Sequence, residues 1–182
     1  MSGSLIKVDE LTVSTGVSSI TLGGGSSGSS GLNTPIDSTF DVYVVYGIDI
    51  ESSAGAYLKA RVTESGSAIS TANYEGAYSL LRSYNTDLER QQSGATEMEV
   101  TRNLQGTGNN NCSFTMWIFN ANNSSEYTYF TNEAVAMTSS TQAEGMAGGN
   151  VYSHTSSVDG LNFFFSSGNI NSGRFILYGL KK

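Results

Sequence analysis

The chain has 182 residues, the length of a single domain, and 38% of them are hydrophobic, which is enough for a packed core. Charged residues make up only 14%, against about 25% in an ordinary globular protein. The net charge is −7, from nine basic and sixteen acidic residues, so no nucleic-acid partner is expected, because phosphate contacts need clustered Lys and Arg.

Three further features narrow the class of protein. Cys112 is the only cysteine, so no internal disulfide is expected. The first residues lack a basic segment followed by an apolar stretch, so we expect no signal peptide and synthesis in a cytoplasm. No apolar run approaches the roughly 20 residues that cross a membrane, so no membrane partner is expected.

The first part of the chain predicts two strands and a loop. Residues 4–13 and 17–22 carry apolar side chains at strand spacing. Residues 23–31 contain only Gly and Ser, which have little to bury, so a flexible loop is expected there. We expect this loop to lie within one domain that spans residues 1–182.

Residues 40–50 give the strongest strand signal, because apolar side chains occupy both faces. One face carries Phe40, Val42, Val44, Tyr46 and Ile48, and the other carries Tyr43 and Val45. Such a strand is central and covered on both sides, or covered once and in contact with a neighbouring subunit. Residues 56–64 alternate cleanly and predict a strand with one buried face.

The middle of the chain is less regular. Residues 74–90 fit either helical or strand spacing, and the tyrosines and turn-rich flanks favour a strand. Residues 97–103 predict a short polar strand. Its two acids, Glu97 and Glu99, resemble the carboxylate pair of a glycosidase only in number, and a solvated strand face is the preferred interpretation.

The last third predicts four more strands. Residues 112–120 and 127–138 are strongly apolar on alternate positions, whereas residues 145–150 are expected to form a loop. Residues 161–165 and 175–180 are expected to pair as a hairpin. The glycines of the intervening turn permit its backbone, Ile170 plugs its end, and Gly179 would let a neighbouring chain approach closely.

These segments amount to eight to ten strands with turn signals between them and no crossover helix. The sequence therefore predicts an all-β protein, an antiparallel β-sandwich of jelly-roll type.

The sequence offers little for catalysis. His154 is the only histidine, and although Asp159 and many serines are available, no Gly-x-Ser-x-Gly elbow accompanies them. One His and one Cys do not make a zinc site. Four acids near strand ends could bind calcium, but capping of turns is preferred for Asp37, Asp41, Asp49 and Glu51. We therefore expect no enzyme, cofactor or metal site.

The aromatic residues are the candidates for binding. Tyrosine buries area while its hydroxyl stays paired, and it also stacks on sugars, so it serves both subunit interfaces and glycan sites. Most of the ten tyrosines are expected to pack within the fold. The candidate interface or ligand residues are Tyr43, Tyr46, Trp117, Tyr127 and Tyr129.

The C-terminus carries a family resemblance. Residues 163–182, FFFSSGNINSGRFILYGLKK, resemble the ending of a group of small tailed-bacteriophage and prophage proteins, in which Ser-Gly-Asn-Ile precedes a final strand closing in Leu-Tyr-Gly. Residues 40–46, 55–62, 73–74 and 125–127 also resemble segments of that group, in the same order. Members are taken as virion structural proteins: head decorations, or parts of tails and fibres.

The resemblance implies a virion protein made in the host cytoplasm. The leading hypothesis is a decoration (cement) protein that binds the major capsid protein or other virion proteins on the outer capsid surface, as a homo-oligomer with a trimer favoured. Residues 1–13 or 23–31 would then act as an arm onto the shell. The alternative is a tail-fibre or receptor-binding module that recognises a host surface glycan.

Overall fold

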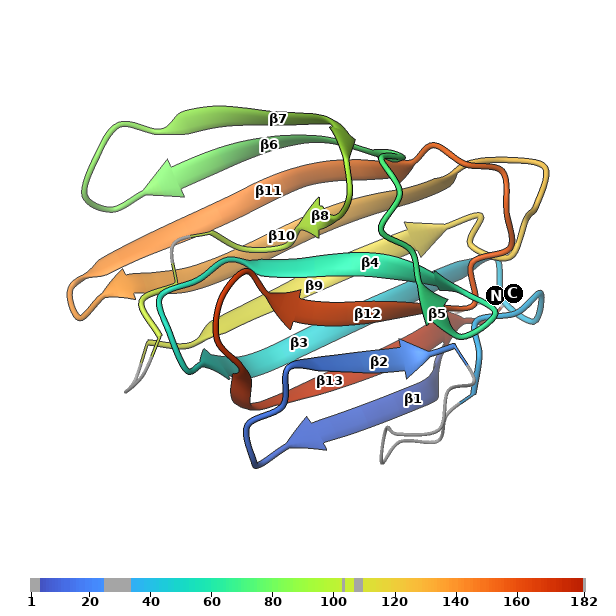
Figure 1. The fold of residues 1–182 in the computed structure, drawn as a ribbon, viewed down its shortest axis with the longest axis horizontal. Coiled ribbons are helices and arrows are strands. Elements are labelled where there is room, and N and C mark those ends of the chain that lie inside the picture. The colour runs from blue at the N-terminus through green and yellow to red at the C-terminus, as the bar shows by residue number, and fades with distance from the viewer. Residues whose placement is uncertain (1–3, 25–33, 103, 107–109, 182) are drawn as a thin grey trace.

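The computed structural model describes residues 4–24, 34–102, 104–106 and 110–181. Within these residues it contains thirteen strands and no helix, so there is also no helix that could span a membrane. Every strand pair is antiparallel, which confirms the predicted all-β class (Figure 1). The jelly-roll type of connectivity stays a prediction.

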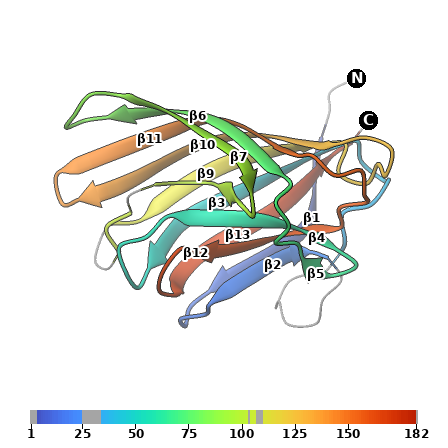
Figure 2. The same ribbon diagram turned by 45° about the horizontal axis from the view of Figure 1, so that its top comes forward.

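The strands form a large and a small sheet that lie face to face, as the tilted view shows (Figure 2). The large, eight-stranded sheet has the order β1 (Leu5–Val13), β13 (Ile170–Leu180), β3 (Val42–Ser52), β9 (Cys112–Phe119), β10 (Thr128–Ser139), β11 (Gln142–Tyr152), β6 (Tyr74–Arg82) and β7 (Leu88–Ala95). The small, five-stranded sheet comprises β2 (Ser19–Gly23), β12 (Gly160–Phe165), β4 (Leu58–Glu64), β5 (Ser67–Ala68) and β8 (Met98–Glu99), which pairs with β4.

The core fills the space between the two sheets. Phe163 of β12 has no exposed surface, and its ring centroid lies 5.4 Å from those of Phe114 and Phe175 in the large sheet. The buried face predicted for β4 is confirmed, since Leu58, Ala60 and Val62 are buried. In β9 the buried face is that of Phe114, Met116 and Ile118. Burial of this alternating set is what fixes the register of both sheets.

Residues 97–102 and 104–106 cover the inner face of the large sheet over β10, β11 and β6 (Figure 1). Asn132 of β10 donates from Nδ2 to the Val100 carbonyl (2.9 Å), and the Glu99 N–H donates to the Tyr78 hydroxyl (3.3 Å). The segment therefore adds polar contacts to the packing of its buried apolar side chains Met98, Val100 and Leu104.

Three predictions about the chain's path need correction. Residues 145–150 are part of the long strand β11, not a loop. Residues 74–90 form strands, as favoured, but two of them, since β6 ends at Arg82 and β7 begins at Leu88. The hairpin of the last two strands is wrong, because β12 and β13 lie in different sheets.

The turn between β12 and β13 therefore crosses from one sheet to the other. Gly168 and Gly173 have positive φ values of 75° and 138°, which favour glycine, and Ile170 is fully buried as predicted. Gly179 admits no neighbouring chain: a Cβ there would lie 2.2 Å from the Phe40 ring of the same chain.

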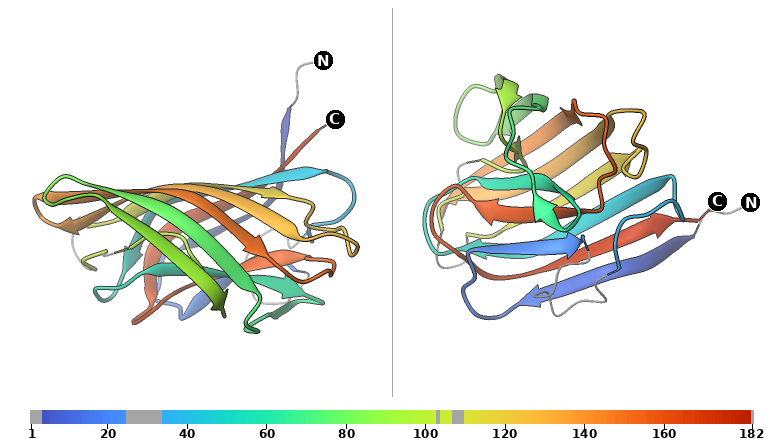
Figure 3. Two further views of the ribbon diagram at one scale, coloured as in Figure 1. Left: turned by 90° about the horizontal axis from the view of Figure 1, so that it is seen from above. Right: turned by 45° about the vertical axis from the view of Figure 1, so that its right-hand side comes forward.

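The termini lie together at one end of the molecule (Figure 3). β1 pairs with β13 of its own chain from Leu5 to Val13, and the Lys181 N–H donates to the Ser4 carbonyl at 2.9 Å. The first strand is thus part of the large sheet. Residues 25–31 of the predicted loop lie outside the described residues.

Candidate functional site

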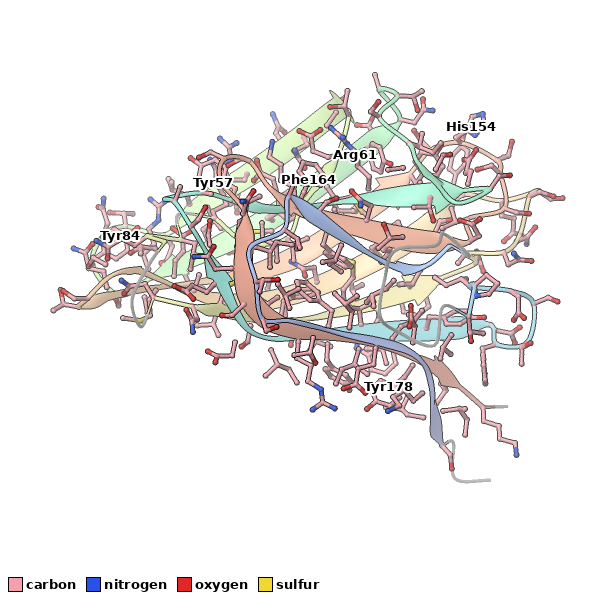
Figure 4. All side chains as sticks on the ribbon, turned by 60° about the horizontal axis from the view of Figure 1, so that its bottom comes forward. Tyr57, Arg61, Tyr84, His154, Phe164 and Tyr178 are labelled. Atoms are coloured by element: carbon pink, nitrogen blue, oxygen red, sulfur yellow. The ribbon has the colours of Figure 1, made fainter. Side chains whose placement is uncertain are left out.

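The outer face of the large sheet, which points away from the small sheet, is the candidate site. The register of the strands places every second residue of each strand on it. Neither the small sheet nor residues 97–102 and 104–106 lie on this side (Figures 2 and 3). Figure 4 shows Tyr178 of this face and Phe164 of the small sheet on opposite sides of the sandwich.

One half of the outer face is an aromatic ridge. We use this name for the outward residues Ile176, Tyr178, Val44, Tyr46 and Trp117, from β13, β3 and β9. Val44 lies between its register partners Tyr178 and Trp117 and has no exposed surface, although it does not belong to the core between the sheets. The rings of Tyr46 and Tyr178 meet edge to face at 5.9 Å. The ridge is thus a second apolar layer.

The other half is a small-residue trough. It consists of the outward residues Gly145, Ala147 and Gly149 of β11 with Ala77 and Ser79 of β6. Ala77 pairs with Gly149 and Ser79 with Ala147, whereas the register partner of Gly145 is Leu81, which bounds the trough at that end. A hollow of about 290 Å³ lies at its border with the ridge, lined by Thr115, Trp117, Thr131, Asn132, Glu133, Ala147 and Gly148. A second, of about 660 Å³, lies over Ala77 and Gly149.

The fold itself does not require all of these small residues. A Cβ added at Gly145 would have its nearest neighbours at 3.9 Å, an ordinary van der Waals distance. By contrast, a Cβ at Gly47 would lie 2.1 Å from the Phe114 ring. The chain's own packing therefore explains the glycine at 47 but not the one at 145.

Large apolar side chains remain exposed on this face. Leu81 is 57% exposed and Val135 is 55% exposed, followed by Tyr129 and Ile48. Contiguous apolar surface of this kind marks an interaction site more often than chance, whereas single exposed residues do not.

The outer face carries charge at its two edges and at one central position, Glu133 of β10. At the β1 edge, Glu10 accepts hydrogen bonds from Arg174 (2.5 Å) and Lys7 (2.8 Å), which lower the pKa of its carboxyl to about 2. Towards the opposite edge the outward charges are acidic, Glu75 on β6 and Glu89 on β7.

The structure separates the five aromatic residues predicted from the sequence. Tyr46, Trp117 and Tyr129 lie on the outer face, with Tyr129 45% exposed. Tyr127 is 42% exposed just before β10. Tyr43 is buried in the core, where its hydroxyl donates to the Asp37 carbonyl (2.8 Å), so it offers no surface for a partner.

The residues considered for catalysis are not brought together. Asp159 accepts from the Thr63 hydroxyl (2.5 Å) and the Gly66 N–H (2.8 Å), not from His154. His154 instead lies 3.8 Å from Glu64, which also accepts from Tyr152 (2.8 Å). These carboxylates stabilise turns and strand ends.

The predicted solvated face at Glu97 and Glu99 is wrong. Glu99 is only 6% exposed and lies between Arg102 (3.5 Å) and Arg90 (3.8 Å). Burial alone would raise the pKa of Glu97, but hydrogen bonds from Lys59, Thr96 and Arg61 outweigh it and hold the pKa at about 2. Sequence reasoning missed the pairs of Glu97 because Lys59 and Arg61 are 38 and 36 residues away along the chain.

Sequence reasoning also missed a buried polar network beneath β8. The Tyr78 hydroxyl donates to Gln92 Oε1 (2.7 Å), contacts the side-chain amide of Asn150, and accepts from the Glu99 N–H. Burial raises the pKa of this hydroxyl. The network ties β6, β7 and β11 to the covering segment.

Among the described residues, no group of three or more His, Cys, Asp or Glu side chains is arranged to hold a metal ion. Asp37 caps a turn by accepting from the Thr39 N–H (2.8 Å), and Asp49 accepts from Asn111 Nδ2 (2.6 Å).

Comparison of the chain with protein-family models, with curated proteins and with solved structures found no match.

Proposed function

We propose that this chain is a non-enzymatic structural subunit of a tailed-bacteriophage particle, a decoration protein that binds the outer capsid surface as a homo-oligomer. The observation that carries the proposal is the outer face of the large sheet, an apolar ridge and trough that no part of the described chain covers. A chain that exposes such a face is expected to work inside an assembly.

The resemblance to small phage proteins supports the same proposal. The described part of the segment that carries it, residues 163–181, contains the second half of β12 and all of β13, one strand from each sheet. β13 also supplies Ile176 and Tyr178 to the ridge. The resembling residues therefore build the fold and part of the proposed contact surface together.

The test is a sedimentation assay with purified protein and two targets. Capsids that lack decoration and intact host cells are each mixed with the chain and pelleted, over a range of concentrations. Saturable attachment to capsids, with none to cells, is the expected result. Attachment to cells alone, competed by host polysaccharide, would contradict the decoration role.

A glycan-binding role in a tail fibre is the second candidate, and one observation favours it. The hollow of about 290 Å³ joins the Trp117 ring to the hydroxyls of Thr115 and Thr131 and the carboxylate of Glu133. An aromatic face beside hydroxyl and carboxylate acceptors is chemistry that recognises a sugar ring. Titration of the chain with host polysaccharide, followed by Trp117 fluorescence, tests it separately from capsid binding.

A further inference from the structure

We propose that the outer face of the large sheet binds the outer face of a second copy of this chain, so that the ridge of each copy lies over the trough of the other. This deepens the proposed function, on which it rests in taking the chain to be a subunit of an assembly. It replaces the trimer expected from the sequence by a two-fold pair.

Shape is the first argument. In the sheet order the ridge strands β13, β3 and β9 lie to one side, and the trough strands β11 and β6 lie to the other. A two-fold axis along the strands, between β9 and β10, exchanges the two halves. It places β3 of one copy over β11 of the other, so that large side chains such as Tyr46 meet the small residues Gly145, Ala147 and Gly149.

Charge is the second argument. The same axis brings the β1 edge of one copy towards the β7 edge of the other. Lys7, Arg174 and Glu10 give the first edge a net charge of +1, from two positive groups and one negative. Glu75 and Glu89 give the second edge −2. The net charges of the two edges are therefore complementary. In a two-fold pair each copy's β1 edge lies near the other copy's β7 edge, so this contact is made twice.

Area is the third argument. Eight strands at about 4.8 Å spacing are roughly 34 Å wide, and seven residues along each strand are roughly 23 Å long. The face therefore offers about 800 Å² per copy, which is the size that a standard stable interface buries on each partner. Its centre holds Trp117, Tyr46 and Tyr129, residue types that dominate the energy of such interfaces.

The pairing is tested by sedimentation velocity of the full chain over a concentration series, together with the emission of Trp117, the only tryptophan. A pair that forms through the outer face buries Trp117 further, so we expect the mass to double and the emission to shift to shorter wavelength over the same concentrations. Association through another surface leaves the emission unchanged.

Two variants complete the test. Ala147 is exposed in the trough, so Ala147→Arg fills the trough without crowding the core and should weaken pairing at least about tenfold. Leu88 is 43% exposed on the opposite face of the same sheet, so Leu88→Glu is the matched control and should leave pairing unchanged. Thermal melts of both variants verify that each still folds.

Each outcome of these experiments either supports the proposed pair or contradicts it. A pair lost in Ala147→Arg and kept in Leu88→Glu supports the proposal. A trimer, or a pair that Ala147→Arg does not affect, overturns it. A chain that stays monomeric and binds capsids, or binds polysaccharide through the trough, overturns the pairing. It shows instead that another molecule covers the outer face of the large sheet. A monomer that binds neither capsids nor cells contradicts the proposed function as well.

Discussion

The two faces of the large sheet are built from similar side chains, but only the inner face is covered by the small sheet. On the inner face, Phe114 and Phe175 pack against Phe163 of the small sheet and lose nearly all their exposed surface. On the outer face, Trp117 and Tyr46 pack only against their neighbours in the same sheet. The alternation of apolar residues along a strand thus predicts which faces are apolar. It does not predict which of these faces the chain itself covers.

The outer surface of the small sheet makes the contrast sharper. There Arg61 stacks over Phe164 at 4.5 Å and pairs with Glu97 at 3.0 Å, while Lys59 pairs with the same carboxylate (Figure 4). This surface satisfies its own charges and aromatic rings within the chain. On the outer face of the large sheet Glu10 and Tyr46 also have partners within the chain, but Leu81 and Val135 stay more than half exposed. It is therefore the surface expected to bind another molecule.

Truncation of the core should give the largest effect on folding. Phe163→Ala is expected to lower the free energy of unfolding by about 3–5 kcal/mol, because it leaves a cavity between the sheets. Urea denaturation measures the change. Tyr129→Ala, on the outer face, is the control and should cost less than about 0.5 kcal/mol in the monomer. Equal losses would break the distinction between the two faces.

A pair of glycine substitutions sharpens the same distinction. Gly47→Ala places a Cβ against Phe114 and Ile50 and should destabilise the fold by about 1–3 kcal/mol. Gly145→Ala meets nothing closer than 3.9 Å and should change stability by less than about 0.5 kcal/mol. Thermal melts compare them, and a large loss at residue 145 would show that the fold does need that glycine.

The polar network under β8 should contribute less than the apolar core. Tyr78→Phe removes the hydroxyl that joins Gln92, Asn150 and the Glu99 N–H, and should cost about 1–2 kcal/mol because buried polar groups lose a partner. Tyr129→Phe removes an exposed hydroxyl and should cost nothing measurable. Chemical denaturation of both variants checks the difference, and no loss in Tyr78→Phe would contradict the network's role.

Acid is expected to have an effect about as small as the loss of the Tyr78 hydroxyl. The folded-state pKa of Glu97, about 2, lies below its ordinary value of 4.5, so its contribution is present above pH 4.5 and is lost as the pH falls from 4.5 towards 2. We expect about 1–2 kcal/mol, because Lys59 and Arg61 are partly exposed and the pair is screened. Unfolding midpoints of wild type and Glu97→Gln across this range should converge at low pH. A constant gap would contradict the assignment.

Much of the fold was predictable because hydrophobic alternation is local. β3, β4, β9 and β10 follow from it directly. β11 was missed because its glycines and alanines carry no apolar signal, and the partners of β12 and β13 were missed because alternation does not state which sheet a strand joins.

The site was predictable only in part, for a related reason. Aromatic residues are conspicuous, and of the five candidates Tyr46, Trp117 and Tyr129 lie on the outer face. Tyr43 and Tyr46 are three residues apart in one strand and therefore point to opposite faces, and only Tyr46 could lie on the outer one. The trough was missed because Gly145, Ala147 and Gly149 are small and carry no functional group that marks a binding residue in the sequence.

The most direct measurement is the reactivity of a thiol placed on the outer face. Cys112 is buried, and burial raises the pKa of its thiol to about 12, so in Val135→Cys the introduced cysteine is the only reactive one. If a second copy covers this face, its rate of alkylation should fall as the protein concentration rises, while Leu88→Cys reacts at a constant rate. A rate for Val135→Cys that is the same at every concentration would contradict the account.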